Sequence, residues 1–360
     1  MPRGRDANSP FHIPRDGWKD ILWRVYGEIG DDRVFLIAAG VTFYLLMALV
    51  PGLSAIFSVY GLFADRATVM GHAAALSSLV PGGGMEIIND QMRRLASQQN
   101  ATLGIAFALS LVLALWSANA GVKALFRAMN VAYGEDEKRA WLELNGVSLL
   151  FTFALVCMAV VLIAATVLLP LVLTTFALKS EILTAAGTYG LVLVTGFLVV
   201  ISLYRWGPSR RNARWKWLVP GAALSVIVMA LASVGFGWYV ANFKSYNATY
   251  GSLGAIIGFM TWIWLSVTIF LVGAEFNSEI EHQTMCDSTT GAPKPMGERG
   301  AVMADTLGRA LVDDRPRHRS ENDGAGGYGR MGARDAHLLK VALAVPVVLA
   351  IAALLSPRSK

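Results

Sequence analysis

The sequence predicts an all-α integral membrane protein: a six-span helical bundle with interfacial helices and one additional C-terminal span. Of its 360 residues, 55% are hydrophobic and only 16% are charged, and the mean hydropathy is +0.50. A soluble globular domain carries more charge, so this composition indicates repeated crossing of a bilayer. Windows of about 20 apolar residues, the length that spans a bilayer, recur at 34–63, 103–119, 147–170, 182–204, 218–243 and 253–274, with a weaker one at 338–355.

Periodicity and composition divide the chain into four regions. Residues 1–33 form a cytoplasmic N-terminal region, and apolar side chains at helical spacing over 16–32 predict an interfacial amphipathic helix within it. Residues 34–283 form the six-span membrane domain. Residues 284–337, rich in Gly, Pro, Arg and Asp, are expected to be a flexible cytoplasmic linker. Residues 338–360 carry the seventh span and the C-terminus.

Basic residues set the predicted orientation, because cytoplasmic loops are enriched in Lys and Arg. If the spans alternate, 23 lysines and arginines fall on one side and 7 on the other, with Lys340 at the start of the last window. We therefore predict a multi-pass protein with its N-terminus in the cytoplasm. The loop 64–100 lies outside in this arrangement, and its apolar periodicity predicts a second surface helix. No apolar signal-peptide core precedes the first span, which is expected to direct insertion.

The first window contains Pro51 near its middle. A proline inside a helix removes a backbone donor and bends or breaks the helix. We expect a kink there that is architectural, or one that exposes backbone groups to a substrate, as the broken helices of transporters do.

The sixth window carries polar and small residues on one face. At 100° per residue they form one stripe, Gly254, Gly258, Thr261, Thr268, Glu275 and Glu279. The opposite face is apolar and is expected to contact lipid: Ile256, Phe259, Ile263, Val267 and Phe270. The two glycines form a GxxxG pair, a common packing device between membrane helices.

Glu275 and Glu279 need partners, because a charged side chain within a bilayer is costly. The cytoplasmic ends of the even-numbered spans converge in the predicted topology and bring basic residues close to these acids: Lys123, Arg127 and Arg205. Glu275 is therefore expected either in a structural ion pair, with Arg127 as the predicted partner, or facing a polar cavity.

Sequence motifs for catalysis are not found in the chain. The five histidines are scattered and Cys157 and Cys286 are the two cysteines, so no metal cluster or disulfide framework is expected. No P-loop, GxSxG, Rossmann or HExxH pattern occurs. We predict no cofactor and no enzymatic activity. The basic stretch 205–217 is interpreted first as a topology determinant, second as a contact for anionic lipid headgroups and third as a nucleic-acid contact.

Four ordered stretches resemble the YihY/BrkB family of bacterial inner-membrane proteins: AAGVTFYLLMALVPGL at 38–53, NAGVKALFRAMNVAYG at 119–134, LYRWGPSRRNARWKWLVPGAAL at 203–224, and the segment 245–281 that ends in GAEFNSEIE. The resemblance covers residues 18–283 and implies a six-span bundle in the bacterial cytoplasmic membrane. Some members carry the older label ribonuclease BN, and others have been linked to serum resistance or lipid handling. The tail from 284 departs from that six-span core.

Three classes of function follow, in order of preference. The first is a transporter or lipid-translocating protein, supported by the polar stripe and the converging charges. The second is a membrane scaffold or assembly factor without transport. The third is a membrane-bound ribonuclease, which the residues do not support. The expected partners are membrane lipids, including anionic headgroups, and not nucleic acid.

Overall fold

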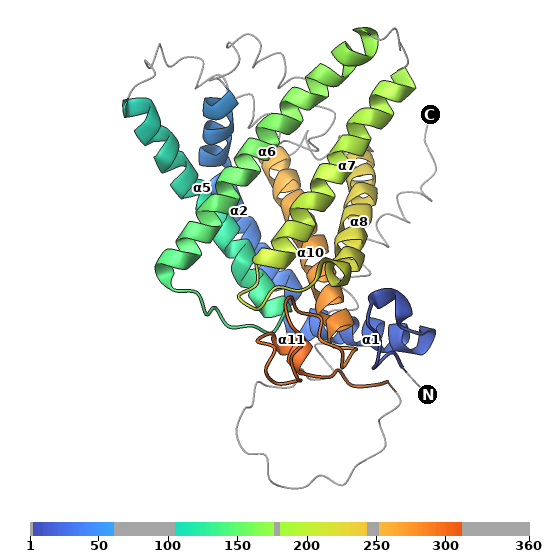
Figure 1. Ribbon diagram of the computed structural model, residues 1–360. Helices are drawn as coiled ribbons and strands as arrows, with labels where there is room; N and C mark the ends of the chain where they lie inside the picture. The colour runs from blue at the N-terminus through green and yellow to red at the C-terminus, as the bar shows by residue number, and fades with distance from the viewer. Residues whose placement is uncertain (1–2, 61–104, 176–180, 243–251, 312–360) are drawn as a thin grey trace.

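The computed structural model describes residues 3–60, 105–175, 181–242 and 252–311 (Figure 1). Its helices, in chain order, are the 3-10 turn η1 (Pro10–His12), α1 (Arg15–Asp31), α2 (Val34–Tyr60), α5 (Ile105–Ala132), α6 (Trp141–Thr175), α7 (Glu181–Trp206), α8 (Trp215–Asn242), α10 (Ser252–Glu281) and the single turn α11 (Val302–Asp305). The described residues form no β-strand; one isolated bridge pairs Ala213 with Thr289. The predicted all-α class is confirmed.

Five of the described helices are long and apolar enough to cross a membrane. Their candidate spans are Val34–Ile56 in α2, Trp141–Ala165 in α6, Thr184–Trp206 in α7, Trp215–Val240 in α8 and Ile256–Glu281 in α10. A helix satisfies its own backbone hydrogen bonds, which hydrocarbon cannot do, so apolar windows of this length fold as helices. The window 103–119 falls largely in α5, which is not one of the five. The seventh window and the predicted surface helix of the loop 64–100 lie outside the described residues.

The long helices pack as a bundle around α2 and α10. α2 runs along α5 and also contacts α10 and α6, while α8 packs between α10 and α7. The main apolar core lies toward one end of the bundle, where the following large side chains are almost completely buried: Phe126, Met129, Tyr133, Tyr204, Leu218 and Leu271. α2 continues as one helix through Pro51, and the kink expected at that residue stays a prediction.

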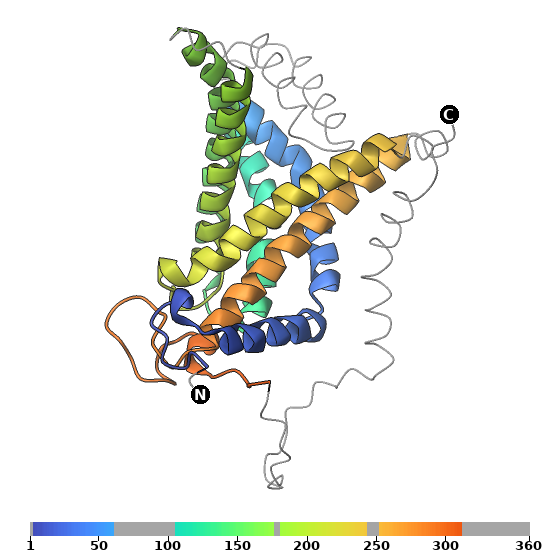
Figure 2. The ribbon, with the colours of Figure 1, turned by 90° about the vertical axis from the view of Figure 1, so that its right-hand side faces the viewer.

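α1 is present where the sequence predicted a surface helix. It lies across the ends of α10 and α8 rather than parallel to them (Figure 2). Ile21 and Val25 on its inner face pack with Trp217 and Ile280 in a second small core. Its other face exposes Trp23 and other large apolar side chains, as in a helix that lies at a membrane interface.

The expectation of a flexible linker beginning at residue 284 is wrong for residues 284–311. This segment is folded against the bundle, and Thr284, Ser288, Thr289 and Arg299 are buried in it. It contains little apolar surface, but hydrogen bonds hold it instead. The Arg299 guanidinium donates to the carbonyls of Met285 (2.6 Å) and Ala304 (2.6 Å). Residues 312–337, the rest of the predicted linker, lie outside the described residues.

Asp305 shows how such a polar segment folds. Its carboxylate accepts backbone N–H groups from Gly297 (2.8 Å), Arg299 (2.9 Å) and Gly300 (3.0 Å). Burial acts to raise the pKa of Asp305, but these donors hold the pKa below its usual value. The composition of this segment predicted disorder because it contains few apolar residues. The segment is nevertheless folded, because hydrogen bonds to side chains such as Asp305 stabilise it in place of apolar burial.

Candidate functional site

Charged loops and surface elements gather at one end of the bundle. α1, the loops 133–140 and 207–214 and the segment 282–311 all lie there (Figure 1). We call this the basic end. The two described loops between spans therefore lie on the same side, as the predicted topology requires, together with α1 and the segment 282–311.

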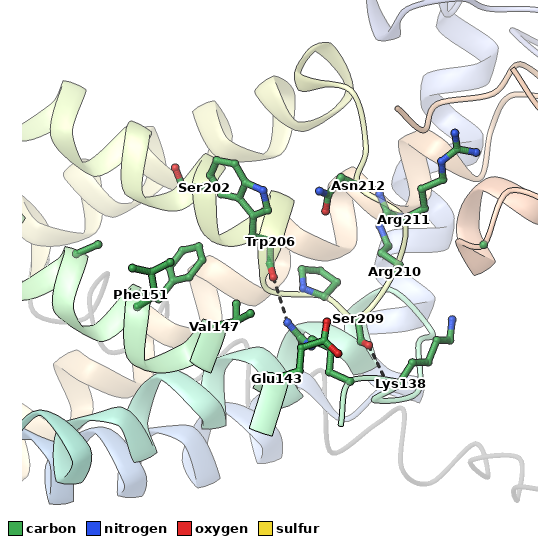
Figure 3. A pocket seen from close by; sticks show the side chains of 15 residues that line it. Lys138, Glu143, Val147, Phe151, Ser202, Trp206, Ser209, Arg210, Arg211 and Asn212 are labelled. Atoms are coloured by element: carbon green, nitrogen blue, oxygen red, sulfur yellow. Dashed lines mark hydrogen bonds between the residues drawn. The ribbon is translucent and has the colours of Figure 1, made fainter. Parts of the chain in front are cut away.

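A cavity of about 800 Å³ opens at the basic end between α6 and α7. We call it the α6–α7 cavity. One wall is apolar and consists of Val147, Leu150, Phe151, Ala154 and Trp206. The floor is polar and mostly basic, with Lys138, Arg139, Glu143, Ser209, Arg210, Arg211 and Asn212 (Figure 3). Leu150 is 66% exposed and Trp206 is 40% exposed, so the apolar wall continues into the outer surface of the bundle.

Arg139 joins the two loops that form the cavity floor. Its guanidinium binds the Glu137 carboxylate through two hydrogen bonds of 2.7 and 2.8 Å, and it also donates to the carbonyl of Gly207 (2.7 Å). Although partial burial acts to raise it, the pKa of Glu137 is lowered to about 2 by these hydrogen bonds and by the Arg139 charge. Glu137 is therefore ionised at neutral pH and fixes the loop 133–140.

Close backbone approach at Gly207 completes this junction. A Cβ atom there would lie 1.8 Å from the Met129 side chain and 2.5 Å from the Leu203 carbonyl. Ser209 then links the loops, because its N–H donates to Asn130 (2.7 Å) and its hydroxyl accepts from the Lys138 N–H (2.9 Å). The floor is thus held by backbone as well as by side chains.

Arg210 and Lys138 differ in what they offer to a ligand. Arg210 is turned into the protein, where it pairs with Glu281 (2.6 Å, side chains 1% and 0% exposed) and stacks 4.4 Å from the Tyr133 ring. Lys138 pairs with Glu135 at 2.6 Å but its side chain is 55% exposed. Arg211 turns its guanidinium away from Phe151 (Figure 3). Lys138 is therefore the cation of the floor that a ligand can reach with least rearrangement.

The acids of the predicted stripe lie in a second polar cluster, where α10 meets α1. Arg24 of α1 forms a salt bridge with Glu279, and the two side chains are 6% and 0% exposed. Arg24 also donates to the Gln283 side chain (2.8 Å) and to the Arg309 carbonyl (2.8 Å). His282 lies 3.3 Å from the other carboxylate oxygen of Glu279. Glu279 thus has the basic partner that was expected, but from a different helix.

Sequence reasoning missed Arg24 although a signal for it existed. Ile21, Arg24, Val25 and Glu28 follow the i, i+3, i+4, i+7 spacing of one helical face. Ile21 and Val25 are apolar core residues. Arg24 and Glu28 lie on the same helical face and therefore must also face the protein. A cation on an apolar face predicts a buried acidic partner.

None of the three predicted cations reaches Glu275. Arg127 is exposed and lines a smaller cavity of about 260 Å³ between α2 and α5. Lys123 donates to Asn145 (2.9 Å), and Arg205 stacks 4.4 Å from the Trp215 ring. The prediction of a Glu275–Arg127 pair is wrong, because neither Glu275 oxygen receives a hydrogen bond from Arg127 or any other donor among the described residues.

The remaining stripe residues do not form one functional face. Gly258 has no atom within 4 Å of an added Cβ, and Gly254 is half-buried. Thr261 is exposed and Thr268 is buried, but each hydroxyl donates to a carbonyl of its own helix, 2.8 Å away. The apolar face predicted to contact lipid includes Phe270, which is 8% exposed.

A different glycine makes the close helix crossing. A Cβ on Gly273 would lie 1.9 Å from Ser225 Oγ and 2.5 Å from Tyr204 Oη, and Gly221 of α8 faces it. Tyr204 donates to the Phe270 carbonyl (2.6 Å) at the same crossing. The small-residue contact of α10 therefore lies at Gly273 and not at the predicted GxxxG pair.

These features define a multi-pass helical membrane protein with one densely hydrogen-bonded polar end. The model of the virulence factor BrkB family matches residues 25–297, most of the chain. The chain belongs to this family, as the sequence resemblance implied. The match extends beyond residue 284 into the folded polar segment, which lies outside the predicted six-span domain.

Curated relatives are membrane proteins or carry a ribonuclease-like name. The chain is 27% identical over 217 residues to YfkH of Bacillus subtilis, described as ribonuclease-like, covering 56% of this chain and 74% of the relative. It is 28% identical over 267 residues to UPF0761 membrane proteins of Xanthomonas campestris and Xanthomonas axonopodis, covering 72% of this chain. The matched region is 59% of the former and 60% of the latter. No solved structure matches the chain.

Proposed function

We propose that the protein binds anionic phospholipid in the α6–α7 cavity and moves it between the two leaflets of the bacterial inner membrane. The observation that carries this proposal is the cavity's two-sided chemistry: an apolar wall that continues onto the outer surface, above a floor with four basic residues and one acidic residue. Acyl chains favour the first surface and a phosphate favours the second.

The basic end faces the cytoplasm in this proposal. The support is the asymmetry of lysine and arginine between the two sides. Reporter fusions at residues 90 and 212 are expected to report opposite compartments, periplasm and cytoplasm. Both fusions reporting the same compartment would contradict the orientation.

Lys138 and Ala154 supply the variants that test lipid binding. Lys138→Gln removes an exposed charge of the floor, and Ala154→Trp fills the space beside the apolar wall. Each has a matched control outside the cavity. Lys19 is an exposed lysine with the same i, i+3 relation to an acid as Lys138, and Val234 is 76% exposed on α8, so the controls are Lys19→Gln and Val234→Trp.

The measurement is binding of a short-chain phosphatidylglycerol to the purified full chain in phosphatidylcholine nanodiscs. Lys138→Gln is expected to weaken binding about 5-fold, because a basic group near a lipid surface contributes about 1 kcal/mol. Ala154→Trp is expected to weaken it at least as much, whereas the two controls bind as the unmodified protein does. Equal binding by all four variants would contradict the assignment of the cavity.

Translocation is tested separately in vesicles that contain a fluorescent phosphatidylglycerol. The proposal predicts that the protein accelerates bleaching of inner-leaflet lipid by an external reductant, and that Ala154→Trp slows it. Binding without acceleration would overturn the translocation step and favour the scaffold role instead. The proposal assigns no enzymatic reaction. In the described part of the chain no group of three or more His, Cys, Asp or Glu is placed to hold a metal ion for a nuclease.

A further inference from the structure

Glu275 has an environment that the proposed lipid site does not explain. It is 1% exposed, and as a carboxylate it has no hydrogen-bond donor to either oxygen among the described residues. An ionised carboxylate left in that state is strongly unfavourable, because burial removes its hydration and nothing replaces it. Some positive species must neutralise it.

Besides burial, the strongest effect on Glu275 comes from another acid. Asp32 acts on it both through its charge and through a side-chain hydrogen bond, which requires a proton on one of the two carboxyl groups. Two carboxylates cannot hydrogen-bond, because neither has a proton to donate. Glu28 and Glu279 add further negative charge around the pair. This is the arrangement in which one proton is held between two carboxyl groups.

Charged groups approach this pair from each element that packs around it, and all of the cations are committed elsewhere. Glu28 and Asp31 of α1, Glu279 of α10 and Tyr133, which follows α5, act on the pair directly. Arg24, His282, Arg210 and Glu281 act in turn on these neighbours. Arg24 is paired with Glu279, and Arg210 with Glu281. The Tyr133 hydroxyl is also buried without a hydrogen-bond partner in the described part of the chain.

The turn that carries Asp32 is strained in a way that holds it in place. Arg33 has φ of +52°, and it is the one non-glycine residue with positive φ in the described chain. A residue with a Cβ adopts this left-handed conformation at an energetic cost, and such residues concentrate at functional sites. The Asp32 N–H donates to the Glu28 carbonyl (2.8 Å), which ends α1 directly beside α10.

We propose that Glu275 and Asp32 form a proton-binding site at the junction of α1 and α10. The proton comes from bulk water by way of Asp32, which is half-buried, while Glu275 is not reached by solvent. Binding forms an O–H bond on one carboxyl group and a hydrogen bond to the other, and it removes one negative charge. No electron is transferred and no other bond changes.

The surroundings favour a proton over a metal ion. The described residues contain no group of three or more His, Cys, Asp or Glu placed to hold a metal, whereas Ca²⁺ and Mg²⁺ take six or more oxygen ligands. Burial, followed by the Asp31 and Glu279 charges, raises the pKa of Asp32, and the hydrogen bond with Glu275 only partly offsets this. Burial, with Glu279 and Asp32, also raises the pKa of Glu28 to about 7.

The site connects the surface helix to the bundle. With the proton bound, the carboxyl pair holds the end of α1 against α10; without it, two carboxylates oppose each other at that contact. Glu281, six residues after Glu275, holds Arg210 of the α6–α7 cavity. The protonation site and the cavity are therefore joined by one helix, but the inference stands whether or not that cavity binds lipid.

Infrared difference spectroscopy of the full chain in nanodiscs tests the proposal directly, because a protonated carboxyl group has a C=O band distinct from that of a carboxylate. The spectra are recorded in a Glu28→Gln background, because Glu28 itself titrates near pH 7. This protein is expected to show the band at pH 7 and to lose it as the pH rises, and adding Glu275→Gln should remove the band. Asp32→Asn should lower the pH at which it disappears by about one unit, because a neighbouring negative charge is gone. The control is Glu298→Gln at an exposed acid.

Thermal unfolding supplies the second readout, recorded in a Glu28→Gln background because Glu28 itself titrates near pH 7. A carboxyl group whose folded pKa is raised gives a stabilisation that is complete below its unfolded pKa and is lost as the pH rises to the folded pKa. The Tm is therefore expected to fall by about 2 to 4 °C per pH unit through the transition, and Glu275→Gln should abolish the fall.

Three results would overturn the proposal. The first is a carboxyl band that is unchanged in Glu275→Gln. The second is a Tm loss in that variant that is the same at every pH, which indicates an ionised Glu275 with a fixed partner. The third is stabilisation of the unmodified protein by NaCl, but not by choline chloride, that disappears in Glu275→Gln, because the bound cation is then sodium.

Discussion

The two halves of α10 contain similar small and polar residues but have different surroundings. In the first half, Gly258 has open space beside it and Thr261 is exposed, with its hydroxyl bonded within its own helix. In the last turns, Glu275, Asn277 and Glu279 are each at most 1% exposed. The comparison teaches that polar residues on a membrane helix hold the fold only where other elements surround them, and here they do so at the basic end.

The surrounding elements come from distant parts of the chain. α1 covers one side of the α10 end, the Gly221 region of α8 covers another, and the segment 284–311 closes the end. Asn277 illustrates the result, because it accepts from the Gly221 N–H (2.8 Å) and donates to the Leu218 carbonyl (3.1 Å).

The largest effect is expected from removing the segment 284–311. A chain ending at Gln283 loses Ser288, which donates to Glu281 (2.7 Å), and the Arg309 carbonyl that binds Arg24. Buried charges are then left without hydrogen bonds, so we expect most of the monodisperse protein seen by size-exclusion chromatography to be lost. A chain ending at Leu311 is the control and is expected to fold. Equal recovery of the two chains would show that the segment does not support the bundle.

Breaking the Arg24–Glu279 pair is expected to have the next largest effect. Arg24→Gln leaves Glu279 buried with His282 as its one remaining basic neighbour among the described residues, and removing one partner of a buried pair costs about 3 to 5 kcal/mol of unfolding free energy. The control is Lys19→Gln, at an exposed pair with Asp16, where the expected loss is below about 1 kcal/mol. The measurement is denaturant unfolding in mixed micelles. Similar losses for the two variants would mean that the buried pair contributes no more than a surface pair.

Two glycine substitutions compare the halves of α10 directly. Gly273→Ala places a Cβ 1.9 Å from Ser225 Oγ, and such overpacking typically costs about 1 to 3 kcal/mol. Gly258→Ala meets open space and is expected to leave stability unchanged or raise it by up to about 1 kcal/mol, because alanine favours a helix over glycine. A larger loss of unfolding free energy for Gly258→Ala than for Gly273→Ala would show instead that the GxxxG pair is the packing contact.

The smallest effect concerns Glu28 and depends on pH. Its pKa is raised from 4.5 to about 7, so its contribution to stability is complete below about pH 4.5 and is lost as the pH rises to about 7. Glu28→Gln cannot ionise and is expected to match the unmodified protein at pH 5. At pH 8 it should be more stable by about 1 kcal/mol, a value reduced for the partial exposure of the side chain. A difference that does not change with pH would contradict the raised pKa.

Local pattern was enough to predict much of the fold. Apolar windows predicted the helices that contain the five described candidate spans, and the spacing from Ile21 to Val25 predicted a surface helix where α1 lies. Sequence stretches alone also indicated the family that the comparisons confirm. These properties depend on hydrophobicity and helical periodicity, which each segment carries by itself.

The side-chain partners of the α10 acids could not be predicted from local sequence pattern. The predicted order of spans placed Arg127 at the same end of the bundle as Glu275, but the rotation of its helix leaves Arg127 exposed. The neighbours of the α10 acids come instead from α1 and the turn that follows it: Arg24 pairs with Glu279, and Asp32 interacts with Glu275.

The sequence by itself therefore determined the class of protein, its apolar helices and the side on which the basic residues gather, because bilayer insertion depends on hydrophobicity and charge counted along the chain. Only the tertiary structure decided which glycine packs, which acid is paired and that residues 284–311 are folded. Those outcomes depend on the rotation and crossing of helices and on hydrogen bonds between segments more than 200 residues apart, such as Arg24 with Glu279.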